Sequence, residues 1–256
     1  MKVEQQLASG LKVRQDFRDS VRFVMFESVV DEITYYGTHG GTAFLVNLEG
    51  NTFAVTCNHV LKDFSWQDIC ITNTKFGEKI VGLKSVFRPS NPSGAAVDSD
   101  ILDVAILQFA DDSRLSDLKD TAYILDKNTV ETSRIGDELH VCGALKDLST
   151  IGESKIKPKF GLLDFNDTGL YEKDIVLRDG TAQYTNVEFE NLVGISGSPV
   201  FNKTLGKLCG MAVRAGLKEG KASLKYIDIE DITNILHGIC NGSLAANYTK
   251  EIIHPK

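Results

Sequence analysis

The residue with the clearest potential for chemistry is Ser196, in the run Gly-Ile-Ser-Gly-Ser-Pro-Val at positions 194–200. The flanking glycines and the nearby proline disfavour a helix or a central strand and favour a tight turn. Such a turn exposes one hydroxyl and directs backbone N–H groups at one point, as a nucleophilic serine with an oxyanion hole requires. We therefore predict that Ser196 is a nucleophile; the alternative is a turn serine without a chemical role.

Two groups upstream supply the partners that such a serine needs. His59 follows the run Ala-Val-Thr-Cys-Asn at positions 54–58, and Asp103 opens the apolar run Val-Ala-Ile-Leu at positions 104–107. A carboxylate beside a buried strand costs stability unless it is paired, and an imidazole N–H is a suitable partner. The predicted set is His59, Asp103 and Ser196, separated by 44 and 93 residues. Asp100 is the alternative acid, less favoured because the apolar run follows Asp103 directly.

The order, the spacing and the three contexts resemble the chymotrypsin-like (trypsin-fold) serine peptidases, most closely their disulfide-free bacterial and viral members. Three further segments share the resemblance: 40–46 before the histidine strand, 136–143 at the start of the second barrel, and 206–213 after the serine. The resemblance spans about residues 22–230. It implies an all-β fold of two six-stranded antiparallel Greek-key barrels, followed here by a C-terminal helix.

The resemblance also implies the roles of the residues. His59, Asp103 and Ser196 would form a triad that acts through an acyl-enzyme, with the backbone N–H groups of Gly194 and Ser196 as oxyanion donors. No metal and no cofactor is required. Ser198 is the alternative nucleophile, disfavoured because a residue before proline is driven towards extended geometry.

Four residues are expected to contact the substrate. An extended peptide would lie along Val213, Arg214 and Ala215 as an added strand. Glu190 occupies the position that often lines the floor of the primary specificity pocket in this family, where a carboxylate would favour Lys or Arg. The alternative for Glu190 is a solvated charge in a surface loop, and the sequence favours that alternative.

The chain departs from the family at Ile195, where an Asp or Asn usually precedes the nucleophile. Ile195 cannot pair with an ammonium group freed by proteolytic activation. We therefore expect it to pack into the second barrel and to hold the serine loop by burial, so that no cut near the N-terminus is needed.

Short apolar runs separated by turns recur along most of the chain, which is typical of barrels rather than of alternating strands and helices. Near the end, Ile229, Ile232, Ile235, Leu236 and Ile239 recur at helical spacing. The expected division is 1–20, an N-terminal arm or helix; 21–125, the first barrel with His59 and Asp103; 126–228, the second barrel with Ser196; and 229–256, a helix and tail.

Composition limits the possible partners. The 256 residues carry a net charge of −7, which disfavours a general nucleic-acid role. No apolar run is long enough to span a membrane, and the first residues lack a signal-peptide core. The five cysteines are odd in number and form no C-x-x-C pair, so we expect reduced, mostly buried thiols and a cytoplasmic protein. Cys57, two residues before His59, is alternatively a redox-sensitive thiol.

Two functions follow from these patterns. The first is a trypsin-like serine endopeptidase that cuts a protein or peptide substrate, with a regulatory protein partner as a plausible restraint. The second is an inactive or conditionally active barrel module that binds an extended peptide. An esterase is disfavoured because the histidine comes first and strand-like residues follow the serine. The sequence leaves the oligomeric state and the natural substrate open.

Overall fold

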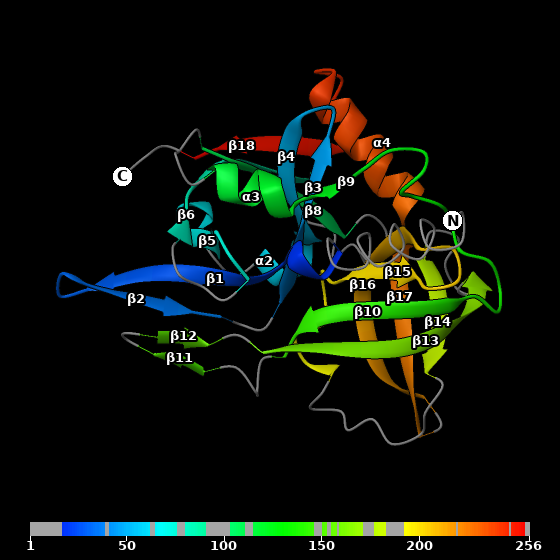
Figure 1. Cartoon of the computed structure of the whole chain (residues 1–256). Coiled ribbons are helices and arrows are strands. Elements are labelled where there is room, and N and C mark those ends of the chain that lie inside the picture. Colours follow the sequence, from blue (N-terminus) through cyan, green and yellow to red (C-terminus); the bar gives the residue numbers. More distant parts are fainter. Residues whose placement is uncertain are drawn as a thin grey trace, which may run out of the picture.

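A computed structural model gives the three-dimensional structure of the chain (Figure 1). It describes residues 17–38, 41–61, 65–75, 80–90, 103–110, 115–145, 150–152, 155–157, 159–170, 177–182, 192–218, 220–245 and 247–253. Strands dominate these residues, which confirms the expected all-β fold.

The first half of the chain forms one ten-stranded sheet, to which the C-terminus adds its last strand. Its spatial order is β18-β7-β8-β4-β3-β1-β5-β6, with β2 on β1 and β9 on β3. The strands are β1 (Val21–Val30), β2 (Ile33–Gly37), β3 (Thr42–Leu48), β4 (Asn51–Cys57), β5 (Ile69–Thr72), β6 (Ile80–Val81), β7 (Leu83–Pro89), β8 (Val104–Phe109), β9 (Tyr123–Ile124) and β18 (Tyr248–Ile252).

The second half forms a closed barrel of six strands in the order β10-β13-β14-β17-β16-β15. Its strands are β10 (Glu138–Ala144), β13 (Phe160–Leu170), β14 (Leu177–Ala182), β15 (Pro199–Asn202), β16 (Lys207–Lys218) and β17 (Lys221–Asp228). A separate hairpin of β11 (Thr150–Gly152) and β12 (Lys155–Lys157) lies beside β2 (Figure 1).

Both halves share one strand order. In the first half the core strands β1, β3, β4, β5, β7 and β8, numbered one to six along the chain, lie in the spatial order 4-1-2-3-6-5. The six barrel strands of the second half, numbered in the same way, give the identical order. The 4-1-2-3 portion is a Greek key, as expected. The first half differs by its four additional strands, β2, β6, β9 and β18.

Short helices connect and flank the strands: α2 (Asn58–Leu61), η1 (Trp66–Asp68), α3 (Leu115–Thr121) and α4 (Ile229–Cys240). The expected C-terminal helix is α4, and Asp228 caps it by accepting a hydrogen bond from the N–H of Glu230. Its buried residues are Ile229, Ile232 and Leu236, which match the predicted apolar face. No helix in the described ranges is long and apolar enough to cross a membrane.

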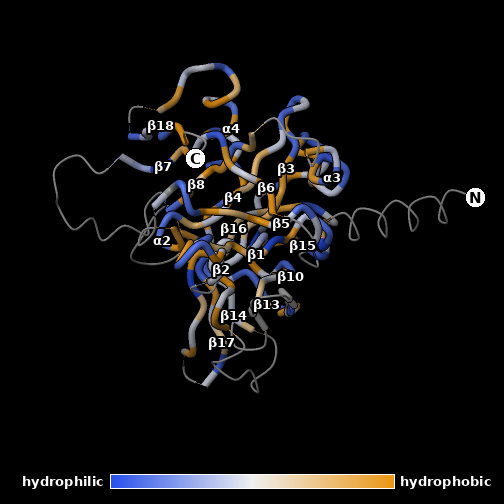
Figure 2. Tube along the Cα trace, turned by 90° about the vertical axis from the view of Figure 1, so that its left-hand side faces the viewer, coloured by the Kyte–Doolittle hydropathy of each residue, from blue (hydrophilic) through white to orange (hydrophobic). Residues whose placement is uncertain are grey.

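The main core joins the two halves. Buried residues of β3, β4 and β8 pack in one cluster with Met211 and Val213 of β16 and with the apolar face of α4. In Figure 2 the hydrophobic colour follows β3, β4 and β8 through the interior. Because the halves share this cluster, β3, β4 and β8 are fixed relative to both halves.

The chain ends of the described part are packed rather than loose. Residues 17–19 are helical, and the Phe17 ring lies 4.7 Å from that of Phe201 on β15. Beyond α4, where the sequence pattern showed only a tail, β18 pairs antiparallel with β7. The side chain of Tyr248 in β18 is buried, and its hydroxyl donates to the carbonyl of Val104 at 3.1 Å.

Candidate active site

His59 lies in α2, one residue into the helix that follows β4. The apolar strand β4 is buried from Thr52 to Cys57, so it fixes the backbone at which His59 begins. The His59 side chain is 40% exposed, so its ring is accessible from solvent. A half-buried imidazole of this kind can accept and return a proton.

Asp103 lies directly before β8 and contacts His59 twice. One carboxylate oxygen accepts the backbone N–H of His59 at 2.8 Å, and the other contacts the ring Nδ1. The Asp103 carbonyl also accepts the N–H of Asn58 at 3.2 Å. Since the Asp103 side chain is only 6% exposed, its contact with Nδ1 holds the ring in one orientation and leaves Nε2 as the ring nitrogen that can exchange a proton. Asp100 lies outside the described residues.

The C-terminal strand β18 places the phenol of Tyr248 near Asp103. Burial raises the pKa of the Tyr248 phenol, and the negative charge of Asp103 raises it further. The phenol therefore stays protonated and keeps its donor on the Val104 carbonyl, next to Asp103. No pattern in the sequence indicates this contact, because Tyr248 is 145 residues from Asp103 in a segment without a strand pattern.

Ser196 lies in a turn between the two halves, as its neighbours predict. Gly194 and Gly197 have φ values of 103° and 84°, which residues with a side chain rarely adopt. Ile195 is 1% exposed and packs in the second-barrel core cluster, as expected for a residue that holds the loop by burial. Ser198 is fully buried, so it is a poor candidate for the nucleophile.

The Ser196 hydroxyl donates a hydrogen bond to the Val213 carbonyl at 2.8 Å. It forms no hydrogen bond with His59 among the described contacts. The hydroxyl would have to rotate about the Cα–Cβ bond of Ser196 before it could donate to His59. Such loose geometry is common in the absence of substrate.

The N–H groups of the two expected oxyanion donors lie on one loop. The backbone N–H groups of Gly194 and Ser196 have no acceptor among the residues that the structure describes. The carbonyls on either side are anchored: Gly194 O to the Thr42 hydroxyl at 2.7 Å and Ser196 O to the Thr42 N–H at 2.8 Å. This arrangement can stabilise a negatively charged oxygen.

The expected substrate residues Val213, Arg214 and Ala215 lie on β16. Pairing of β16 with β15 ends at Met211, whereas its pairing with β17 continues to Lys218. The register against β17 shifts between Ala212 and Arg214, so Val213 is an extra, bulged residue. One edge of β16 therefore lacks a strand partner in the described structure from the bulge onwards. Glu190 lies outside the described residues.

Cys57 lies beneath the His59–Asp103 pair. The Cys57 thiol is fully buried and donates to the Ala212 carbonyl at 3.3 Å. One ligand-type atom from each of Cys57, His59 and Asp103 lies within 4.8 Å of the others, so a thiophilic metal ion would find sulfur, nitrogen and oxygen ligands here. Such an ion would compete with the His59–Asp103 contact rather than support it.

As expected, none of the other cysteines forms a disulfide in the part of the chain that the structure describes. Cys70, Cys142 and Cys209 are buried and Cys240 is partly buried. Burial raises the pKa of the Cys70 thiol to about 12, with the charge of Glu27 adding to the effect. A thiol that burial keeps protonated in this way is a poor nucleophile.

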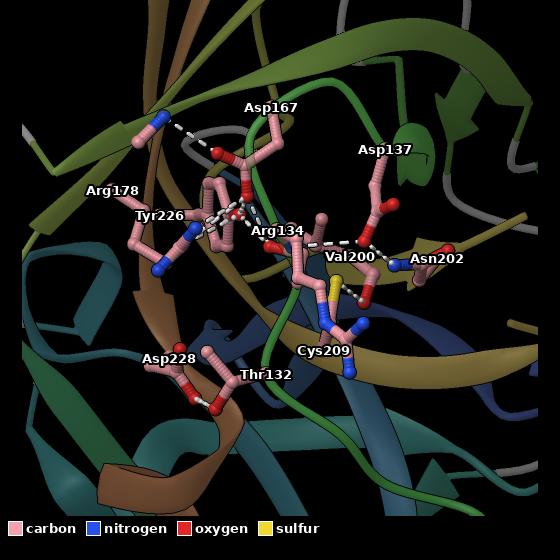
Figure 3. Close-up of polar contacts among 12 residues, drawn as sticks. Thr132, Arg134, Asp137, Asp167, Arg178, Val200, Asn202, Cys209, Tyr226 and Asp228 are labelled. Carbon is pink, nitrogen blue, oxygen red and sulfur yellow. Dashed lines mark hydrogen bonds and ion pairs between the residues drawn. The ribbon is translucent and has the colours of Figure 1, made fainter. Parts of the chain in front are cut away.

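A buried ionic cluster stabilises the barrel that carries the serine loop (Figure 3). The fully buried carboxylate of Asp167 accepts hydrogen bonds from Arg178 at 2.8 Å and from Tyr226 at 2.6 Å, and it also contacts Ser133. Burial raises the pKa of Asp167, but these hydrogen bonds and one from the N–H of Gly169 outweigh it and leave the pKa below its usual range. The cluster joins β13, β14 and β17 to Ser133, which lies in the segment between the two halves.

Comparison with known proteins agrees with this geometry. Residues 41–211 match the family model of the trypsin-like peptidase domain. The match covers more than half of the chain, so the chain belongs to the trypsin-like peptidase family. No curated protein sequence matches the chain significantly.

Solved structures show the same fold at low sequence identity. A scabies mite inactivated protease paralogue, S-D1, is 12% identical with a TM-score of 0.57 over 91% of this chain and 95% of that one. Mouse neuropsin, a serine protease, is 10% identical with a TM-score of 0.57 over 88% and 96%. An inactive serine-to-alanine mutant of Rv3671c from M. tuberculosis is 16% identical with a TM-score of 0.53 over 91% and 93%. These likenesses support the chymotrypsin-like fold alone.

Proposed function

We propose that the protein is a serine endopeptidase that hydrolyses peptide bonds through an acyl-enzyme. The observation that carries the proposal is the double contact of Asp103 with His59. The glycine-flanked serine turn comes from the other half of the fold, and its hydroxyl bonds to Val213, one residue from the Ala212 carbonyl that Cys57 contacts. A merely structural histidine would not need its ring and its backbone held by one buried carboxylate. Membership of the trypsin-like peptidase family supports the same reaction class.

The proposed reaction follows the usual division of roles. Ser196 rotates from Val213 towards His59 and attacks the substrate carbonyl. His59 accepts the proton and then gives it to the leaving amine, while Asp103 stabilises the imidazolium. The N–H groups of Gly194 and Ser196 stabilise the oxyanion. Losing one such donor typically costs about 3 kcal/mol of transition-state stabilisation.

An extended peptide is the substrate that the open edge of β16 favours. Strand alternation places the backbone groups of Ala215 on the same edge as those of Val213, so a peptide can add as an antiparallel strand. A substrate N–H that bonds to the Val213 carbonyl would compete with the Ser196 hydroxyl for it. Substrate binding would thereby release the nucleophile.

We also propose that the protein acts in the cytoplasm, on a protein substrate and without nucleic acid. The free cysteines and the net charge of −7 support this placement. The contact between Ser196 and Val213 is one point at which a regulatory partner could control the enzyme.

The experiment is labelling with a fluorophosphonate probe that reacts with activated serines. The wild-type chain should be labelled on Ser196, as located by mass spectrometry, and Ser196→Ala should not be labelled. An adduct on another serine would contradict the assignment of the nucleophile. A folded wild type that is not labelled would contradict the proposed activity.

The second candidate is a barrel module that binds an extended peptide without cutting it. The observation in its favour is the same bond from Ser196 to Val213, which keeps the hydroxyl away from His59. A peptide library incubated with the wild type separates the two candidates. Cleavage products support the peptidase, whereas bound and intact peptides support the module.

A further inference from the structure

Thr42, the first residue of β3, uses all of its polar atoms in contacts around the serine loop. Its N–H donates to Ser196 O at 2.8 Å, and its hydroxyl donates to Gly194 O at 2.7 Å. The same hydroxyl accepts the N–H of Ala144 at 2.8 Å, and the Thr42 carbonyl accepts the Thr56 hydroxyl at 2.7 Å. Thr42 is fully buried, so water does not compete for these contacts.

The hydroxyl bond is the main restraint on one peptide plane of the loop. The peptide between Gly194 and Ile195 has its carbonyl on Thr42 and its N–H 3.4 Å from Leu192 O, a weak bond. Gly194 has no Cβ and a φ of 103°, so little in its own sterics prevents this plane from rotating. Without the two anchors to Thr42, the backbone from Gly194 to Ser196 could shift away from β3, and the N–H groups of Gly194 and Ser196, the proposed oxyanion donors, would shift with it.

Thr42 also connects the two halves of the catalytic machinery. It belongs to the first sheet, in which its neighbour Ala43 pairs with Thr56 on β4, the strand that leads to His59. The loop that it holds and Ala144 belong to the second barrel. A side chain added at Gly197 would collide with the Thr42 carbonyl, so the two halves touch without a gap here.

We propose that Thr42 is a positioning residue that fixes the oxyanion loop and sets its placement relative to His59. This inference rests on the proposed serine chemistry for its kinetic effect, but the restraint on the loop exists with or without that chemistry. The loop bond needs a hydroxyl, and the buried space needs a small side chain. Serine at this position would keep the hydroxyl, whereas valine would keep the shape and remove it.

The test compares Thr42→Val and Thr42→Ser with the wild type by two measurements. The first is hydrogen exchange of the segment 192–198, followed by mass spectrometry, which needs no activity. Thr42→Val should lose protection in this segment, and Thr42→Ser should keep it.

The second measurement is cleavage of a peptide that the wild type accepts. Thr42→Val should lower kcat by about 10- to 100-fold with little change in KM, because the β16 edge is untouched. Thr42→Ser should retain kcat within about threefold.

Ser85→Ala is the matched control, because it removes a buried hydroxyl bond, to Gln108 at 2.7 Å, in the same sheet. It should leave both measurements unchanged.

If Thr42→Val does not fold, Thr42→Ala replaces it, since a smaller side chain adds no clash. Unchanged exchange of 192–198 in the valine or alanine variant would overturn the inference, as would an equal fall of kcat in the serine variant. A wild type without activity would overturn the proposed function, while the exchange measurement would still decide the role of Thr42.

Discussion

The Ser196 hydroxyl donates its hydrogen bond to the backbone carbonyl of Val213, at 2.8 Å. Val213 is the bulged residue of β16, and the bulge directs its carbonyl at the serine turn. The proposed nucleophile is therefore held by the strand that is proposed to bind substrate. Under the proposed function, substrate that binds to Val213 would release the hydroxyl, so the hydroxyl and its neighbours are the natural targets for mutation.

Asp103→Asn should reduce the rate of peptide cleavage at neutral pH by a factor on the order of 10⁴. The physical reason is that an amide at this position can donate to Nδ1 and so favours the wrong imidazole tautomer. The measurement is kcat/KM on a cleaved peptide. Asp100→Asn is the control, and it should lower kcat/KM only slightly. The reverse ranking would show that the acid is Asp100.

Ser198→Ala should leave fluorophosphonate labelling at the wild-type rate. The Ser198 hydroxyl is fully buried and has no hydrogen-bond partner among the described residues. Removing an unsatisfied buried hydroxyl should leave the free energy of unfolding unchanged or raise it by about 1 kcal/mol. Chemical denaturation checks the stability. A large loss of labelling with an unchanged fold would mean that Ser198 has a chemical role.

Gly197→Ala should lower the labelling rate by at least about 100-fold, because the new methyl group would push the loop away from Thr42. Gly206→Ala is the matched control. Gly206 also has a positive φ, 71°, but open space surrounds it. The control should therefore lose only about 1 kcal/mol of stability through backbone strain and keep its labelling. If both substitutions lowered the labelling rate equally, backbone strain rather than the contact with Thr42 would be the cause of the loss.

Asp167→Asn should destabilise the second barrel by about 3–5 kcal/mol at pH 7, since it leaves Arg178, whose side chain is only 12% exposed, without its charge partner. A carboxyl whose pKa is lowered on folding stabilises the protein above its unfolded pKa of about 4, and this stability is lost as the pH falls through the folded pKa. The variant should therefore lose less stability than the wild type on acidification below pH 4. Denaturation at several pH values measures this, and the exposed Asp120→Asn should behave as the wild type.

A fusion tag placed before Met1 should leave probe labelling intact. Ile195 is 1% exposed in the second-barrel core, so burial holds the serine loop where a charged residue would need a freed amine. Labelling before and after limited proteolysis near the N-terminus checks the prediction. Labelling that appears only after the cut would show activation by processing.

Much of the architecture could be predicted from local patterns. The glycines around Ser196, the apolar strand before His59 and the helical spacing of Ile229, Ile232 and Leu236 each describe a nearby backbone, and the structure has a turn, a strand and a helix there. Turn, strand and helix preferences depend on a few neighbouring residues, so the sequence displays them directly.

Contacts between distant segments could not be predicted in this way. The strand order 4-1-2-3-6-5 occurs in both halves, although no repeat is visible in the sequence. Strand β18 follows no clear pattern because it lies at the edge of a sheet and buries little beyond Tyr248. Its place beside β7 depends on a partner about 160 residues away.

The sequence by itself determined the types and the order of the reactive groups: His59, Asp103 and a serine in a glycine turn. The tertiary structure alone decided which atoms meet. It buries Ser198 and leaves Ser196 partly exposed, it places the Ser196 hydroxyl on Val213, and it brings the Thr42 hydroxyl to Gly194, 152 residues away. The physical reason is that hydrogen bonds and burial depend on distances in space, which arise only when both halves pack around their common core.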